Sequence, residues 1–119
     1  MNTKEFAEEV HNICIKECYG LIYDWLEKKE SILRTTEEAE KYYEFYQSLD
    51  PKNKEMLLGL LKTTSVNSVC SLLAILDNRC VGNFSEDFKL TYGDNPESLN
   101  NFELFDEFSN IATEWDNNI

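Results

Sequence analysis

The residues best suited to metal chemistry are one histidine and two cysteines near the N-terminus. His11, Cys14 and Cys18 are spaced at i, i+3 and i+7, so on a helix they would lie within roughly 60° of one another. A tetrahedral zinc site would need a fourth ligand, such as Cys70 or Cys80. No Cys-x-x-Cys spacing supports such a site, and both helical cysteines fall in an apolar stripe, where free cysteine acts as a small hydrophobic residue. We therefore expect core packing and no metal, with a small metal-binding regulator or enzyme centred on these three residues as the alternative.

Sets of residues for other kinds of catalysis are weaker still. Glu8 and His11 form one Glu-x-x-His unit, but di-iron bundles use two such units and the chain has a single histidine. A Cys–His nucleophile pair would have to combine His11 with a cysteine that the pattern buries. Acidic pairs such as Glu86 and Asp87 are expected by chance in a chain with 23 Asp and Glu residues. We expect no enzymatic activity and no cofactor.

The composition narrows the classes of partner. A formal net charge of -12 opposes binding to nucleic-acid phosphates and to anionic lipid, so a charged partner should be a basic protein. The N-terminal segment MNTKEFAEEV carries charges where a signal peptide needs an apolar run. The uncharged stretch 63–76 is shorter than the about 20 apolar residues of a membrane span. We expect a soluble cytoplasmic protein with reduced cysteines, no direct nucleic-acid contact and no membrane contact.

Four helices are predicted from apolar periodicity and capping signals. The first covers about 3–30, and the second begins at a capping box of Thr35 and Glu38. Asp50 followed by Pro51 begins the third helix, about 51–77, because Asp caps exposed amides and proline suits the first helical position. The fourth covers about 101–115.

The third helix should be the centre of the fold. It has no charged residue from Thr63 to Leu76, and a helix that is apolar all round is usually a buried one. After it, Phe88, Leu90 and Tyr92 alternate with polar residues, which predicts a small β strand or hairpin near 86–99. The predicted fold is therefore mainly α: a single domain of residues 1–119 with four helices, in which the first, second and last surround a buried central helix.

Two surfaces are candidates for binding a partner. The last helix has an acidic outer face without a compensating lysine, and the second helix carries more aromatic rings than one face can bury. The simpler interpretations are a solvated acidic face and tyrosines that pack inward, whereas an exposed Phe45 would indicate an interface, including that of a homodimer. The candidate partner-binding residues are Glu103, Asp106, Glu107, Asn110, Glu114, Tyr42, Phe45 and Tyr46.

The functional hypothesis is a non-enzymatic acidic protein that inhibits or masks a basic protein partner. One setting is a bacterial immunity protein that blocks a toxin, often a nuclease with a basic site. The other is a phage inhibitor of a host defence protein, in some cases by imitating nucleic-acid charge. No motif in the sequence assigns the chain to either group, and of the two we favour immunity.

Overall fold

The computed structural model describes residues 1–30, 36–79 and 82–117, and these residues are mainly α-helical, as predicted. An α-helix, α1 (Thr3–His11), continues through a π-helical turn, η1 (Asn12–Glu17), into α2 (Cys18–Lys28). These three elements form one column. The other helices are α3 (Glu37–Gln47), α4 (Pro51–Leu76) and α5 (Leu104–Asn117).

Local capping explains where the helices begin. The Asp50 carboxylate accepts a hydrogen bond from the Asn53 amide at 2.8 Å, with Pro51 in the first turn, so the predicted start of α4 is confirmed. The Thr36 hydroxyl accepts from the Ala39 amide at 3.1 Å and caps α3. The predicted capping residue, Thr35, lies outside the described residues. The capping residue in the structure is Thr36, the next residue along the chain.

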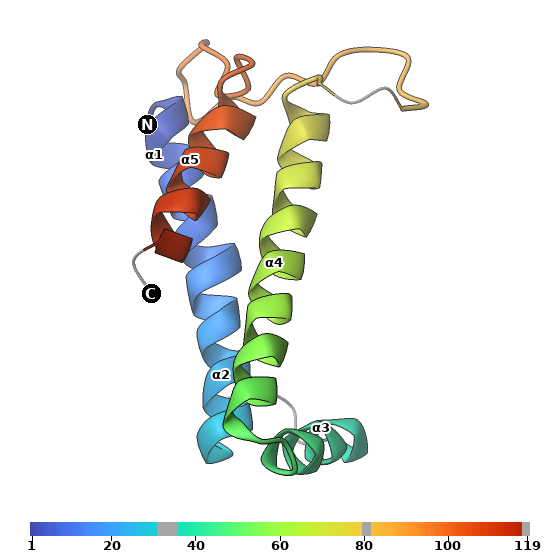
Figure 1. Ribbon diagram of the computed structural model, residues 1–119. Coiled ribbons are helices and arrows are strands. Elements are labelled where there is room, and N and C mark those ends of the chain that lie inside the picture. Colours follow the sequence, from blue (N-terminus) through green and yellow to red (C-terminus); the bar gives the residue numbers. More distant parts are fainter. Residues whose placement is uncertain (31–35, 80–81, 118–119) are drawn as a thin grey trace.

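The helices make an open, elongated molecule (Figure 1). The α1–η1–α2 column runs antiparallel to α4, while α5 packs against α1 and α4 near one end and α3 packs against α2 at the other. The molecule measures 51 × 30 × 28 Å, with a radius of gyration of 17.2 Å. A compact domain of this length would have a radius of about 13.5 Å. Much of the helix surface is therefore uncovered.

Buried side chains form two clusters rather than one. The upper cluster joins α1, η1, α4 and α5, and the lower cluster joins α2 and α3 with partly buried leucines of α4. The upper cluster consists of Ala7, Ile15, Leu73, Leu104, Phe108 and Ala112, and the lower one of Trp25, Leu26, Ala39 and Tyr46.

The prediction that the third helix is enclosed by the others is wrong. Only Leu73 and Ala74 of α4 are buried, and Leu72 is 55% exposed within the stretch expected to lie inside. The reason is that the α1–η1–α2 column and α5 contact α4 from one side, and α3 lies across one end. By length and composition alone, α4 is also a helix that could cross a membrane.

The predicted strand or hairpin near 86–99 is absent from the described residues. Side-chain amides take the place of a strand partner: the Phe88 amide donates to the Asn78 carboxamide oxygen at 2.8 Å, and the Leu90 amide donates to that of Asn100 at 2.9 Å. Two backbone bonds are formed within this segment, from the Leu99 amide to the Leu90 carbonyl at 2.7 Å and, in the turn, from the Asn95 amide to the Tyr92 carbonyl at 3.3 Å. The apolar–polar alternation of residues 88–92 therefore belongs to a segment without a neighbouring strand, whose Phe88 and Leu90 amides bond to asparagine side chains.

A buried aspartate joins the end of α4 to the start of α5. The Asp77 carboxylate is fully buried and accepts hydrogen bonds from the Phe102 amide at 2.7 Å and the Phe105 amide at 3.1 Å. Arg79 lies 3.5 Å from the same carboxylate and 2.8 Å from Asp106. The Asp77 carboxylate therefore accepts hydrogen bonds from two backbone amides, one in the first turn of α5 and one just before it, that have no partner within the helix.

Replacing this carboxylate should unfold the upper end of the molecule. We expect Asp77→Ala to lower the free energy of unfolding by about 2–4 kcal/mol, because two backbone amides lose a buried charged acceptor. Asp106→Ala, which removes only the exposed partner of Arg79, should cost less than about 1 kcal/mol. Urea denaturation followed by circular dichroism measures both values, and equal losses in the two variants would contradict the role given to Asp77.

Candidate functional site

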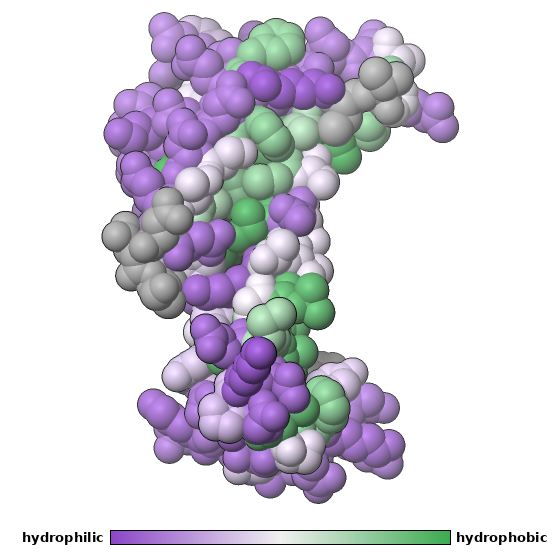
Figure 2. Space-filling model, in the orientation of Figure 1, coloured by the Kyte–Doolittle hydropathy of each residue, from purple (hydrophilic) through white to green (hydrophobic). Residues whose placement is uncertain are grey.

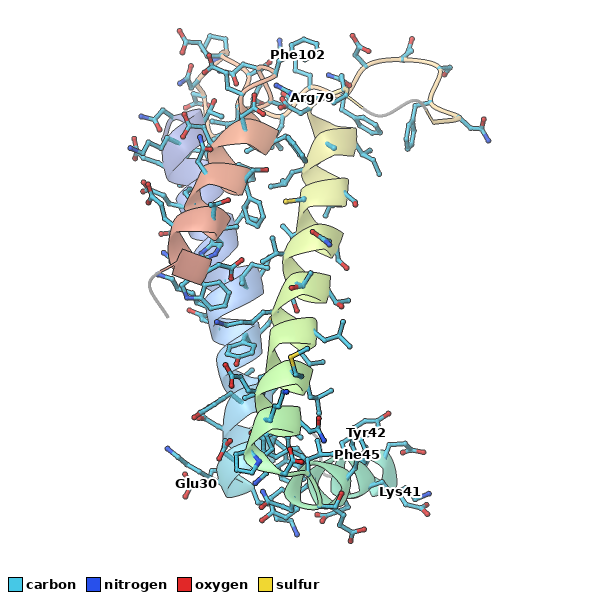
Figure 3. The ribbon with its side chains drawn as sticks, viewed as in Figure 1. Glu30, Lys41, Tyr42, Phe45, Arg79 and Phe102 are labelled. Carbon is cyan, nitrogen blue, oxygen red and sulfur yellow. The ribbon has the colours of Figure 1, made fainter. Side chains whose placement is uncertain are left out.

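An apolar groove lies where α2, α3 and α4 meet. It has a volume of about 860 Å³ and opens to solvent. Tyr42 and Phe45 project from α3 at the foot of α4 (Figure 3). The lining side chains are Ile22, Trp25, Leu26, Thr36, Ala39, Tyr42, Phe45, Leu57 and Leu61.

Three hydrogen bonds fix α3 against α2 and so set the shape of the groove. The Trp25 indole N–H donates to the Ala39 carbonyl at 2.8 Å, and the Gln47 amide group donates to the Leu26 carbonyl at 2.8 Å. The Tyr46 hydroxyl donates to the Glu27 carboxylate, and burial together with this bond raises the pKa of Tyr46 above its ordinary value. The groove is therefore held open by bonds between its walls.

The aromatic residues of α3 divide between core and surface. Tyr42 is 62% exposed and Phe45 is 57% exposed, so the side chain expected to indicate an interface does lie at the surface. Tyr46 is completely buried, which corrects its assignment as a partner-binding residue. Phe45 lies about 100° around the helix from Tyr46 and so faces away from the buried side, whereas Tyr42, one turn before Tyr46, lies at the edge of that side.

The helix α3, which forms one wall of the groove, is acidic. This helix contains four glutamates and one lysine. Lys41 pairs with Glu37 at 3.4 Å, and Lys29, at the end of α2, pairs with Glu40 at 2.8 Å. An apolar groove with one wall formed by a helix of net negative charge favours a segment that is apolar in the middle and basic at its edges.

The acidic face predicted for the last helix lies at the other end of the molecule from the groove (Figure 1). Glu103 precedes α5 and is exposed, as are Asp106, Asn110 and Glu114, while Glu107 is half-buried. The expectation that this face is uncompensated is wrong at Asp106, which pairs with Arg79. The structure therefore does not bring the two predicted binding surfaces together.

His11, Cys14 and Cys18 do not converge. His11 is completely buried, whereas Cys14 and Cys18 are exposed, which corrects their predicted place in the core stripe. The cause is the π-helical turn Asn12–Glu17, whose wider turns shift the register of every residue after His11. Within the described part of the chain, no group of three His, Cys, Asp or Glu residues could hold a metal ion.

The His11 ring is instead a packing element between α1 and α5. Its centroid lies 5.7 Å from that of Phe108 and 5.3 Å from that of Trp115, and neither ring nitrogen has a hydrogen-bond partner. Burial lowers the pKa of His11 below 6.5; Lys16 lowers it further, and Asp116 opposes the change. The residue is therefore held neutral in an apolar site.

Comparison with protein-family models, with curated protein sequences and with solved structures finds no match to this chain. The site must therefore be interpreted from its own chemistry.

The groove was not predicted from the sequence. Ile22, Leu57 and Leu61 are apolar residues at helical spacing, a pattern typical of faces that pack inward, yet they line an open surface. The available signal was that the first helix carries an apolar stripe wider than one neighbour can cover.

The buried histidine should make stability depend on pH. Because the pKa of His11 is lower in the folded chain than the unfolded value of 6.5, the unfolded chain takes up the proton first as pH falls. Stability from this site is thus lost as pH falls below about 6.5. His11→Phe keeps a ring against Phe108 and Trp115 but cannot be protonated. We expect its free energy of unfolding to exceed that of wild type by more at pH 5.5 than at pH 7.5; a constant difference would contradict this account.

Thiol reactivity should follow exposure. We expect Cys14 and Cys18 to be alkylated quickly in the folded protein, whereas Cys70 should react slowly because it is half-buried and burial raises the pKa of its thiol. Mass spectrometry of peptides after timed labelling measures each site separately. Denatured protein provides the control, in which all three should react at similar rates. Slow labelling of Cys14 and Cys18 in the folded chain would contradict the register given to η1.

Proposed function

We propose that this chain is a non-enzymatic binding protein that holds an apolar segment of a basic partner protein in the groove between α2, α3 and α4. The observation that carries the proposal is the exposure of Tyr42 and Phe45 at an open apolar groove, one wall of which is the acidic helix α3. Exposed apolar surface of this kind marks interaction sites in soluble proteins.

The chemistry of the lining favours a protein segment over a small polar ligand. Small-molecule sites use a few polar groups to fix orientation. Here the Trp25 indole N–H is bonded to Ala39, and the Thr36 hydroxyl accepts a hydrogen bond from the Ala39 amide that it caps, so the hydroxyl groups of Thr36 and Tyr42 are the few polar donors left in the lining. What remains suits an amphipathic helix, which inserts side chains at i, i+3, i+4 and i+7 into such a groove.

Charge supports a basic partner. The net charge of -12 attracts a positive protein at long range and raises its association rate, and the glutamates of α3 repel an acidic competitor. The acidic face of α5 is a second candidate contact for a partner large enough to reach both ends.

The biological setting that we favour is inhibition of a toxin, as by an immunity protein. Inhibition of a host defence protein by a phage protein is the alternative. Both settings require a basic protein surface with an apolar segment that can enter the groove.

Synthetic peptides test the recognition chemistry. The probe is a fluorescent peptide of about 18 residues with leucines at i, i+3, i+4 and i+7 and lysine at both ends, and its matched control carries glutamate at the ends. By fluorescence anisotropy we expect the lysine peptide to bind wild type at least about tenfold more tightly than the glutamate peptide.

Variants assign the binding to the groove. Phe45→Ser should weaken binding of the lysine peptide by about tenfold or more, as for an aromatic residue central to an interface. Phe84→Ser removes a ring that is 53% exposed near the far end of α4 and should leave binding unchanged. Equal affinity for the two peptides, or equal losses in the two variants, would refute the proposed groove.

A further inference from the structure

The side of α4 that faces away from α5 is exposed and uncharged. Spacings of three, four, seven and eight residues place its members on one helical face, called here the α4 crest. The crest is separate from the groove, because the α4 residues that line the groove, Leu57 and Leu61, do not belong to the crest. The crest consists of Met56, Leu60, Thr63, Thr64, Asn67 and Ser71, and all six are exposed.

Such a face is unusual on this protein. Charged residues make up 29% of the chain, yet the crest contains none, and Met56 and Leu60 are 66% and 62% exposed. Protein interfaces are depleted of charge at their centres. Beside α4, the surface in Figure 2 has a concave outline between α3 and the segment that follows α4.

Two exposed serine hydroxyls along α4 already donate to backbone carbonyls of the same helix. The Ser68 hydroxyl donates to the Thr64 carbonyl at 2.8 Å, and the Ser71 hydroxyl donates to the Asn67 carbonyl at 2.9 Å. Covering these serines would therefore leave no hydroxyl donor unsatisfied. Gly59, beside the crest, has open space where a Cβ would lie, so another helix can approach closely.

The two ends of α4 differ in charge. Its first half carries Lys52, Lys54 and Lys62 with one acidic residue, Glu55. Residues 82–103, which connect its other end to α5, carry five acidic residues and one lysine. A second copy placed antiparallel would bring Lys52 and Lys54 of each copy toward the acidic segment of the other, whereas a parallel copy would bring the two acidic segments together.

We propose that two copies of this chain associate through antiparallel α4 crests, with the twofold axis near Thr63 and Thr64. The contact is isologous, so the same face of each copy is used. Its uncharged surface lets chains with a net charge of -12 approach each other, and it covers α4 without closing the groove.

Sedimentation velocity over a concentration series measures the association. We expect wild type to form a dimer whose population rises with protein concentration. Leu60→Asp places a charge in the interface, so it should remain monomeric at concentrations at least about tenfold above the one at which half of the wild type is dimeric. Phe45→Ser should dimerise normally. A monomeric wild type at all concentrations would overturn the proposal, as would binding of monomeric wild type to neutral phosphatidylcholine vesicles.

Disulfide trapping tests the antiparallel direction in a background without the native cysteines. Thr64→Cys should cross-link to itself on oxidation. Met56→Cys should cross-link only when mixed with Ser71→Cys, because these residues face each other across the axis. Cross-linking of Met56→Cys to itself would overturn the antiparallel arrangement. The lysine peptide should still bind Leu60→Asp, so failure of the dimer and failure of the groove are distinguishable.

Discussion

The buried carboxylate of Asp77 determines how the upper half of the molecule is built. A charge without solvent must be satisfied by donors, and here the donors are the backbone amides of Phe102 and Phe105. This requirement brings the start of α5 to the end of α4, although about 25 residues separate them. Arg79 adds a second link by pairing with both Asp77 and Asp106. The direction of α5 along α1 follows from this junction, and so does the burial of His11 beneath it.

In a molecule joined in this way, the other helices cover α4 from one side only. α5 covers one side of the α1–η1–α2 column and α4, while α3 crosses their foot through the bonds of Trp25 and Tyr46. The remaining surface of α4 is left to solvent. Its uncharged crest and the neighbouring groove are therefore consequences of the same arrangement, and both proposed contacts lie along the helix expected to be the hidden core.

Register after His11 depends on the π-helical turn. A regular helix would place Cys14 and Cys18 in the same stripe as the histidine, and the sequence gives no local sign that the turns widen. The packing of Ile15 into the upper cluster, beside Leu73 and Phe108, accompanies the wider turn. Such a turn arises from tertiary packing, so a metal site that periodicity allows is not assembled.

The sequence alone determined the helical class and the start of α4 at Asp50, because capping acts over a few residues. It also predicted the amphipathic α5, with Phe108 on its inner face. Only the tertiary structure decided which faces are covered, so Tyr46 is buried while Phe45 is exposed. The physical reason is that a charge-free helix face has the same residue pattern whether it packs inside one chain or against another molecule.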